Sequence, residues 1–197
     1  MAKGNKWDDH YTTRARHEKW LARSVYKLEE IDGKHRIIHR NDRILDLGCY
    51  PGSWSQYCIK KVGLKGEVVG VDLQKPDRFS APNFKYIEAD IFLLETEWLK
   101  KEIHERDVVL SDMAPKTTGI RSVDTSQSLA LAEKALEITV ALLKKNGSFL
   151  CKVFEGEDFK AFRTKVSNYF KDISILRPSA VRKRSREVFL LGTKFMQ

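Results

Sequence analysis

The sequence predicts an α/β fold with a seven-stranded, mostly parallel sheet, helices on both of its faces and an antiparallel last strand. Short apolar runs alternate with helical patterns along the chain, without repeats or an obvious linker, and this alternation is typical of a parallel sheet. The two final apolar runs, Ile173–Leu176 and Val188–Leu191, have only a basic loop between them, so we expect them to pair antiparallel. With 197 residues, 42% of them hydrophobic, the chain suffices for one domain with a substantial core. We therefore expect a single domain over residues 1–197.

The predicted elements begin with a polar, basic head over residues 1–20. Apolar residues at helical spacing then predict a helix over Trp20–Ile31. Five short apolar runs predict the parallel strands, and these are Ile44–Leu47, Val68–Val71, Phe84–Ile87, Val108–Leu110 and Phe149–Val153.

Helical patterns connect these strands. They are Ser53–Val62, a short stretch near Glu97–His104, a long one from about Thr125 to Lys145, and a stretch marked by Phe159, Phe162, Val166 and Tyr169. We expect the long helix to end at Asn146-Gly147, because glycine and asparagine favour the left-handed conformation that closes many helices.

Charge is unevenly distributed along the chain. The formal net charge is +9, and basic residues gather in the head and in RPSAVRKRSR, residues 177 to 186. Such clusters bind polyanions by releasing counterions, so they predict contact with nucleic acid, although a solvated basic surface explains them equally well. The residues that we expect to contact RNA are Arg14, Arg16, Lys19, Arg23, Arg182, Lys183 and Arg184.

Aromatic residues in the head add a second feature of nucleic-acid binding. Trp7, Tyr11 and Trp20 offer ring faces on which unpaired bases can stack. For Trp20 we favour packing of the first helix over base stacking.

Several classes of protein are disfavoured. No apolar run approaches the ~20 residues of a membrane span, and the N-terminus lacks the apolar core of a signal peptide, so we expect a cytoplasmic protein. The three cysteines, Cys49, Cys58 and Cys151, lie in predicted core elements without metal-ligand spacing. We interpret them as small hydrophobic residues and expect neither a disulfide framework nor a metal site.

A glycine loop follows the first predicted strand. In DLGCYPGSWSQY, Gly48 and Gly52 bracket a tight turn, and Ser53 can cap the next helix. A loop of this kind lets the backbone approach a ligand. It matches neither G-x-G-x-x-G nor the phosphate-binding G-x-x-x-x-G-K-[ST], so a pyrophosphate is not the expected ligand.

Acidic residues stand at the ends of the next two strands. Asp72 ends VGVDL, where a carboxylate can accept hydrogen bonds from both hydroxyls of a ribose. Asp90 ends EAD, where it can accept from an adenine amino group. Either one alone is explained as a strand-end cap. Together with the glycine loop they predict an adenosine-type ligand without a pyrophosphate, and S-adenosylmethionine fits that description.

A lysine interrupts the apolar run GSFLCKVFEGE. Lys152 is expected to be buried there, and a buried ammonium group needs a carboxylate partner. Asp112 ends the fourth strand in VVLSDMAP, so it is the expected partner in a neighbouring strand. Taken alone, this pair reads as an ordinary ion pair, Lys27 as an exposed helix residue, and Glu187 with Arg186 as a surface pair.

Four motifs, DLGCYPGSWSQY, SDMAP, CKVFEGE and RSREVF, occur in this order and resemble the FtsJ/RrmJ (RlmE) family of ribosomal RNA 2'-O-methyltransferases from about Thr13 onward. The resemblance implies a Rossmann-like, S-adenosylmethionine-dependent methyltransferase fold. It implies a cofactor site formed by Gly52, Trp54, Asp72, Asp90 and Asp112, which Gly48 of the glycine loop would join. It implies a catalytic set of Lys27, Asp112, Lys152 and Glu187. Cys49, Tyr50 and Ser53 depart from the small residues and glycine usual in the family's loop.

Methyl transfer to a ribose hydroxyl requires alignment with the sulfonium carbon and a group that accepts the proton. Our hypothesis is that Lys152 accepts the proton, Asp112 holds its amine, and Lys27 and Glu187 orient the hydroxyl. An unperturbed lysine titrates about 3.4 units above pH 7, so a neutral amine costs roughly 4.6 kcal/mol. The sequence leaves open what supplies this energy.

The resemblance also implies the substrate. Bacterial members of the family methylate a uridine ribose of large-subunit ribosomal RNA on the assembled subunit, and a monomer without a metal ion is the simplest expectation. Two alternatives stay open: a 2'-O-methyltransferase of another RNA, such as a transfer RNA anticodon loop or an mRNA cap, and a non-catalytic ribosome assembly factor. A nicotinamide-dependent dehydrogenase is disfavoured because G-x-G-x-x-G is missing.

Overall fold

The computed structural model describes residues 6–76, 78–182 and 185–197, with side chains from residue 10 onward. Its strands are β1 (Arg43–Leu47), β2 (Glu67–Asp72), β3 (Phe84–Glu88), β4 (Arg106–Ser111), β5 (Leu143–Phe154), β6 (Phe170–Leu176) and β7 (Glu187–Phe195). Its helices are α1 (Lys6–His17), α2 (Val25–His35), α3 (Ser53–Val62), α4 (Thr96–Ile103), α5 (Arg121–Leu142) and α6 (Phe159–Ser167).

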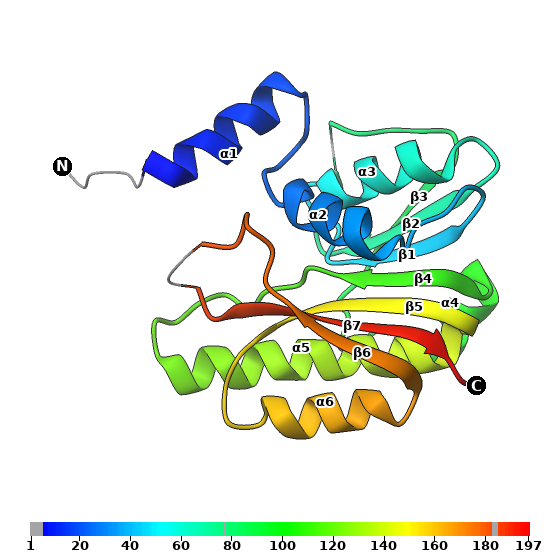
Figure 1. Cartoon of the computed structure of the whole chain (residues 1–197). Coiled ribbons are helices and arrows are strands. Elements are labelled where there is room, and N and C mark those ends of the chain that lie inside the picture. The colour runs from blue at the N-terminus through cyan, green and yellow to red at the C-terminus, as the bar shows by residue number, and fades with distance from the viewer. Residues whose placement is uncertain (1–5, 77, 183–184) are drawn as a thin grey trace.

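The described strands form one sheet in the order β3-β2-β1-β4-β5-β7-β6 (Figure 1). Strands β1 to β5 run parallel, and Leu45 of β1 lies opposite Val69 of β2 and Val109 of β4. Strand β7 is antiparallel to both β5 and β6. The predicted seven-stranded, mostly parallel sheet with an antiparallel last strand is therefore confirmed.

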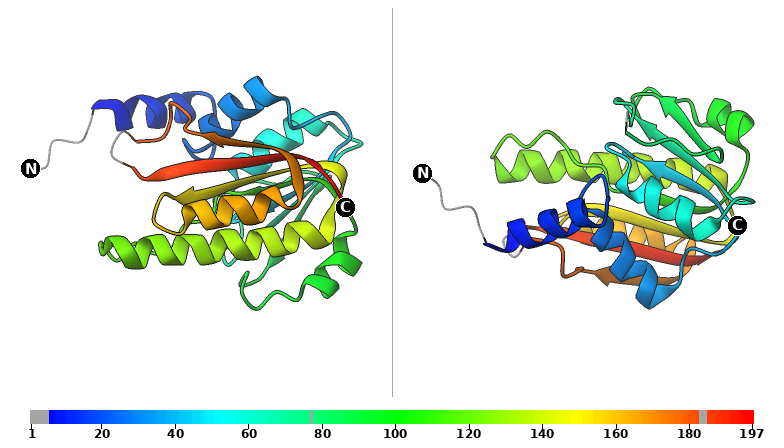
Figure 2. Two further views of the ribbon diagram at one scale, coloured as in Figure 1. Left: turned by 60° about the horizontal axis from the view of Figure 1, so that its bottom comes forward. Right: turned by 90° about the horizontal axis from the view of Figure 1, so that it is seen from above.

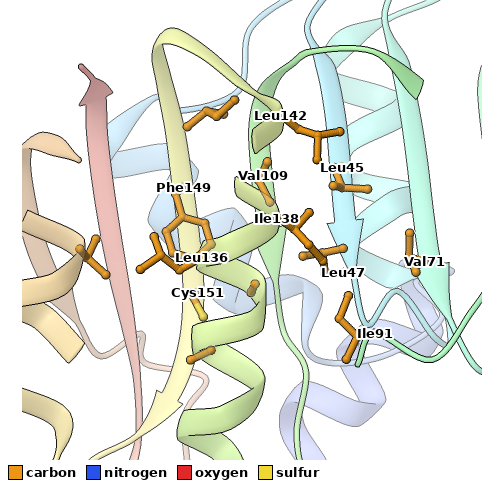
Figure 3. Close-up of a cluster of buried hydrophobic side chains, with 14 of the residues drawn as sticks. Leu45, Leu47, Val71, Ile91, Val109, Leu136, Ile138, Leu142, Phe149 and Cys151 are labelled. Atoms are coloured by element: carbon orange, nitrogen blue, oxygen red, sulfur yellow. The ribbon is translucent and has the colours of Figure 1, made fainter. Parts of the chain in front are cut away.

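Helices cover both faces of the sheet (Figures 1 and 2). Helices α4, α5 and α6 pack on one face, where Leu47, Val109, Leu136 and Phe149 belong to one apolar cluster (Figure 3). Helices α1, α2 and α3 pack on the other face in a second cluster that includes Phe189 of β7. Burial on both faces explains why the central strands are almost continuously apolar.

The N-terminal region differs from the prediction. Residues 6 to 17 form helix α1, for which the sequence analysis named no helix, and the predicted Trp20–Ile31 helix begins only at Val25 and extends to His35. Lys19 has a φ of 60°, a left-handed conformation that interrupts a helix. Of the predicted apolar pattern, Leu21 therefore lies before the helix, whereas Val25, Leu28 and Ile31 are buried within it.

The long helix α5 also differs from its predicted bounds of Thr125 to Lys145. It starts four residues earlier, at Arg121, and ends at Leu142, because Leu143 already has the extended φ of −77° and ψ of 132°. The predicted C-cap at Asn146-Gly147 is wrong. Asn146 has a φ of 66° inside β5, where the register with β4 shifts between Arg106 and Val108. The left-handed residue there forms an irregularity in the strand.

The topology decides where a ligand can bind. The strand order reverses between β1 and β4, and a crevice at the carboxyl ends of strands is expected at such a point. The carboxyl ends of β1, β2, β4 and β5 share one edge of the sheet with the start of antiparallel β7. Among the described helices, none has the length and apolar character needed to cross a membrane.

Candidate active site

Four charged residues from four elements meet at this edge of the sheet. Lys27 comes from α2, Asp112 follows β4, Lys152 lies near the end of β5, and Glu187 begins β7. Lys152 Nζ is 2.9 Å from Asp112 Oδ1, and Lys27 Nζ is 2.6 Å from Glu187 Oε1. Lys27 Nζ also lies 4.0 Å from Asp112 Oδ1, so the two pairs are joined. We call these four residues, which the family resemblance named as a catalytic set, the tetrad.

Lys152 is the most buried member of the tetrad. Only 6% of its side chain is exposed, and its ammonium group donates to the backbone carbonyl of Asp112 as well as contacting the carboxylate. Strand β5 delivers it because Lys152 pairs with Phe189 of β7, deep in the sheet. The expected carboxylate partner is therefore present, and the backbone carbonyl adds a second acceptor.

Lys27 lies beside both carboxylates of the tetrad. Burial lowers the pKa of Lys27, but the negative charges of Asp112 and Glu187 outweigh this effect and leave the pKa above the ordinary lysine value. Its Nζ also lies 5.7 Å from the centre of the Phe189 ring. Lys27 is accordingly an ammonium cation at neutral pH.

A pocket with a volume of about 430 Å³ opens next to the tetrad. Its lining residues come from the end of β2, the loops after β1, β2, β3 and β4, and helix α5. They include Gly48, Asp72, Asp90 and Asp112. Three separate strand ends thus supply carboxylates to one pocket. Pockets of this size commonly hold a small ligand or cofactor.

The carboxylates of Asp72 and Asp90 also organise their own loops. Asp72 accepts hydrogen bonds from the backbone N–H groups of Tyr50 and Gln74, and Asp90 accepts one from the N–H of Phe92. Both side chains are only half-buried, so lone pairs remain for a ligand. The turn-forming and the ligand-facing interpretations are compatible in this geometry.

Comparison with known proteins decides the family. A family model described as FtsJ-like methyltransferase matches residues 20–195. The chain belongs to the FtsJ-like methyltransferase family. A protein of Desulfatibacillum aliphaticivorans named ribosomal RNA large subunit methyltransferase E is 47% identical to it, over 95% of this chain and 91% of the relative. A Bdellovibrio bacteriovorus protein of the same name is 45% identical over 93% of this chain and 95% of that one.

Solved structures agree with this assignment. A Plasmodium falciparum protein described as a ribosomal RNA methyltransferase superposes with a TM-score of 0.79 at 26% identity, over 90% of this chain and 99% of that one. Aeropyrum pernix fibrillarin, solved with bound S-adenosylmethionine, superposes with a TM-score of 0.61 at 18% identity, over 86% and 76% of the two chains, and supports the fold.

The predicted cofactor of this FtsJ-like methyltransferase, S-adenosylmethionine, is confirmed by the family. The pocket also fits it chemically, since the hydroxyl and amino donors of an adenosine group match the carboxylate acceptors at the strand ends. No pyrophosphate-binding glycine motif is needed for this ligand. Among the described residues, no cluster of three or more His, Cys, Asp or Glu side chains offers a metal site.

Two predicted cofactor residues lie outside the pocket lining of the methyltransferase. Trp54 is 3% exposed, donates from its indole nitrogen to the Ser24 carbonyl and packs against Phe189, so its side chain belongs to the core. Gly52, with a φ of 111°, is the N-cap of α3, and a Cβ there would lie 3.1 Å from Leu21. Ser53 does not cap α3 as predicted, because Gly52 holds the N-cap position and the Ser53 hydroxyl contacts the hydroxyl of Ser24.

Asp46 is a notable residue of the methyltransferase that our sequence analysis missed. It lies fully buried in β1, where its Oδ2 accepts a hydrogen bond from the Ser55 hydroxyl and its Oδ1 has no partner. Burial raises the pKa of Asp46 to about 7. The sequence did contain a signal for Asp46, because it is a charged residue inside an apolar run, as Lys152 is.

Helix α1 of the basic head lies beside the loop between β6 and β7 (Figures 1 and 2). The Arg23 guanidinium donates to the Ala180 carbonyl, and the Glu30 carboxylate accepts from the Ser179 backbone N–H. These bonds join the N-terminal segment to the loop between β6 and β7. The methyltransferase therefore presents its two predicted RNA-binding segments as one surface.

The predicted RNA-binding residues differ in their surroundings. Arg14 pairs with Glu18 at 2.7 Å and lies over the Tyr26 ring, so much of its charge is used within the chain. Arg16, Lys19 and Arg182 are exposed. Lys183 and Arg184 lie outside the described residues.

The aromatic residues of the head are mostly engaged within the chain. Trp20 packs against Tyr57, with the Lys60 ammonium 3.8 Å from its ring centre, which agrees with the expected packing role. Tyr11 packs against Tyr26. The side chain of Trp7 lies outside the part that the structure describes.

A larger open groove of about 1220 Å³ lies between the start of α5 and the loop after β5. No tetrad residue lines it, and its charged residues are Arg121, Lys160, Glu155, Glu157 and Asp158. Three acids against two bases make it a poor site for a polyanion. The 430 Å³ pocket beside the tetrad is the better candidate for the chemistry.

Proposed function

We propose that this protein transfers a methyl group from S-adenosylmethionine to the 2'-hydroxyl of a uridine in large-subunit ribosomal RNA, as a cytoplasmic enzyme acting on the assembled subunit. One observation carries the proposal: a lysine with 6% of its side chain exposed is held against Asp112, which also lines the adjacent 430 Å³ pocket. The names of the relatives support large-subunit ribosomal RNA as the substrate. The uridine and the assembled subunit rest on the family resemblance.

The two lysines of the tetrad take different roles in this proposal. The raised pKa of Lys27 keeps it protonated, so it is not the proton acceptor. Lys152, in its neutral form, accepts the hydroxyl proton through Nζ while Asp112 holds that nitrogen in place. Lys27 and Glu187, which lie 2.6 Å apart, orient the ribose hydroxyl. The cofactor, when bound, supplies an electrophilic methyl group.

Pocket residues orient the cofactor for this reaction. Asp72 accepts from the ribose hydroxyls and Asp90 from the adenine amino group, each with lone pairs that its loop leaves available. Gly48 lets the backbone come close, since its φ is 77° and a Cβ would lie 2.5 Å from Met113 Cγ. Alignment of the reacting atoms can lower the barrier by several kcal/mol.

RNA binding is assigned to the surface formed by the basic head and the basic loop. Exposed Arg16, Lys19 and Arg182 contact phosphates in this proposal, with Arg14, Arg23, Lys183 and Arg184 as further contributors. The surface lies beside the tetrad because α2 follows the head and β7 follows the loop.

The test is transfer of labelled methyl from S-adenosylmethionine to large ribosomal subunits that lack the modification. Free ribosomal RNA, transfer RNA, capped mRNA and the Lys152→Ala protein are assayed in parallel. Label on one uridine 2'-oxygen of the subunits, lost in the variant, is the expected result. Label on transfer RNA or a cap would redirect the assignment to another RNA, and cofactor binding without any transfer would favour an assembly factor.

A further inference from the structure

Arg186, immediately before Glu187 of the tetrad, is anchored to helix α5. Its Nη1 donates to Thr125 Oγ1 at 2.7 Å and to the Arg121 carbonyl at 3.2 Å. The Thr125 hydroxyl itself donates to the Arg121 carbonyl at 2.8 Å. Thr125 therefore uses its hydrogen within the helix and offers its lone pairs to the guanidinium.

The loop after β5 closes the other side of this anchor. The backbone carbonyl of Arg186 accepts a hydrogen bond from the Glu155 N–H at 2.9 Å, and its guanidinium carbon lies 6.0 Å from the Phe154 ring centre. A Cβ at Gly156 would lie 2.2 Å from Thr125 Cγ2, so the glycine lets this loop approach α5. Arg186 thus joins α5, the end of β5 and the start of β7.

Neighbouring residues in an extended segment point to opposite faces of the sheet. Arg186 reaches the face covered by α5, whereas Glu187 reaches Lys27 on α2, which packs on the other face. Glu187 is the first residue of β7, where it pairs with Phe154 of β5. A strand end is held weakly by its ladder alone, so a side-chain anchor one residue away can decide the direction of Glu187.

We propose that Arg186 is a positioning residue: its bonds to Thr125 and Arg121 orient the start of β7 so that Glu187 contacts Lys27. The kinetic part of this inference rests on the proposed function. Without the anchor, Glu187 and Lys27 no longer hold the hydroxyl in line, and the turnover rate falls. The cofactor pocket, lined by other loops, keeps its affinity.

A plain phosphate contact is the competing explanation, because Arg186 belongs to the basic loop. Thr125→Val separates the two roles. Valine keeps the shape and leaves every positive charge in place, but it removes the nearer of the two acceptors of Arg186 and leaves only the Arg121 carbonyl at 3.2 Å. A phosphate contact predicts normal turnover in Thr125→Val, whereas the anchor predicts reduced turnover.

The experiment measures kcat and KM for RNA and cofactor in Arg186→Ala, Arg186→Lys, Thr125→Val and the double variant Arg186→Ala/Thr125→Val. We expect kcat to fall by about tenfold in Arg186→Ala and Thr125→Val, the loss expected from a modest misalignment, with KM for the cofactor unchanged. The double variant should be no worse than Arg186→Ala, because both changes break one anchor. Arg186→Lys should recover part of kcat. Arg182→Ala, a charge loss in the same loop, should instead raise KM for RNA.

An NMR titration of the Lys27 ammonium gives a readout that needs no activity. Separating Glu187 from Lys27 should lower the pKa of Lys27 in Thr125→Val and Arg186→Ala alike. Unchanged kcat and unchanged Lys27 titration in Thr125→Val would overturn the inference, even if Arg186→Ala raised KM for RNA. Should wild type transfer no methyl to any RNA, the proposed function fails and the titration alone decides about the anchor.

Discussion

Lys152 carries an ammonium group into a site where only 6% of its side chain is exposed. Burying an ammonium group costs desolvation free energy unless acceptors surround it, and the carboxylate and backbone carbonyl of Asp112 are those acceptors. The proposed use is proton transfer.

Lys152→Ala should lower kcat by ~10²–10⁴, the usual contribution of a positioned base. Affinity for S-adenosylmethionine should change little, because Lys152 is not among the lining residues of the cofactor pocket. The measurement is the pH-rate profile of both proteins alongside calorimetric cofactor binding. An ascending limb shared by wild type and variant would exclude Lys152 as the base.

Asp46 makes a second residue-scale prediction, on stability. Its pKa is raised from 3.8 to about 7 by burial in the folded protein. Between about pH 4 and pH 7 the unfolded chain releases this proton while the folded protein retains it, so stability falls as pH rises through this window. At ~1.36 kcal/mol per pKa unit, the charged carboxylate costs roughly 4 kcal/mol above pH 7.

Asp46→Asn removes the titration but keeps an oxygen that accepts from the Ser55 hydroxyl. Relative to the variant, wild type should lose roughly 4 kcal/mol of unfolding free energy between pH 4 and pH 8. Urea unfolding of both proteins at several pH values measures this difference. A constant difference across the range would show that Asp46 is charged in the folded protein.

At the scale of elements, the turn from β1 to α3 depends on a glycine conformation. Gly48 has a φ of 77°, and a Cβ there would lie 2.5 Å from Met113 Cγ. Gly48→Ala should lower the unfolding free energy by ~1–3 kcal/mol through backbone strain and this clash, and should weaken cofactor binding. Thermal unfolding and calorimetry test both effects.

Gly33 is the matched control, because it lies inside α2 with nothing within 4 Å of an added Cβ. Gly33→Ala should raise the unfolding free energy by about 0.5–1 kcal/mol, the helix preference of alanine. A stable Gly48→Ala protein with normal cofactor affinity would contradict the close approach of this loop to the pocket.

The elements also show where local patterns were sufficient. Strands β1 to β4 and helix α3 lie close to their predicted bounds, and burial on both faces makes the apolar runs of the central strands unambiguous. Strand β5 begins at Leu143, six residues before its predicted start at Phe149. Helix α1 was missed because its residues are mostly polar, with a stripe of apolar contacts too sparse to recognise. The end of α5 was misplaced because Asn146-Gly147 lies in β5, at a register shift that is defined only by pairing with β4.

At the scale of the whole molecule, RNA binding should depend on one continuous basic surface. Replacing exposed Arg16 and Lys19 by glutamate should weaken RNA binding and reduce the salt dependence, by a slope of ~0.7 for each lost contact to single-stranded RNA. The double variant Lys100→Glu/Lys101→Glu, an equal charge change at two exposed lysines of α4, should have little effect. Filter binding at several salt concentrations compares them. Equal losses in both proteins would indicate a non-local charge effect.

The sequence by itself determined the α/β class, the carboxylates Asp72, Asp90 and Asp112 at strand ends, and the lysine inside the fifth apolar run. A charged residue in or at the end of an apolar run is visible without coordinates. The grouping of Lys27 and Glu187 with Asp112 and Lys152 came instead from the family resemblance. Only the tertiary structure decided that Trp54 belongs to the core, that Arg23 bonds to the basic loop, and that Arg186 bonds to α5. These depend on contacts between residues far apart in the chain, and such pairings are set by how the faces of the sheet pack, not by local pattern.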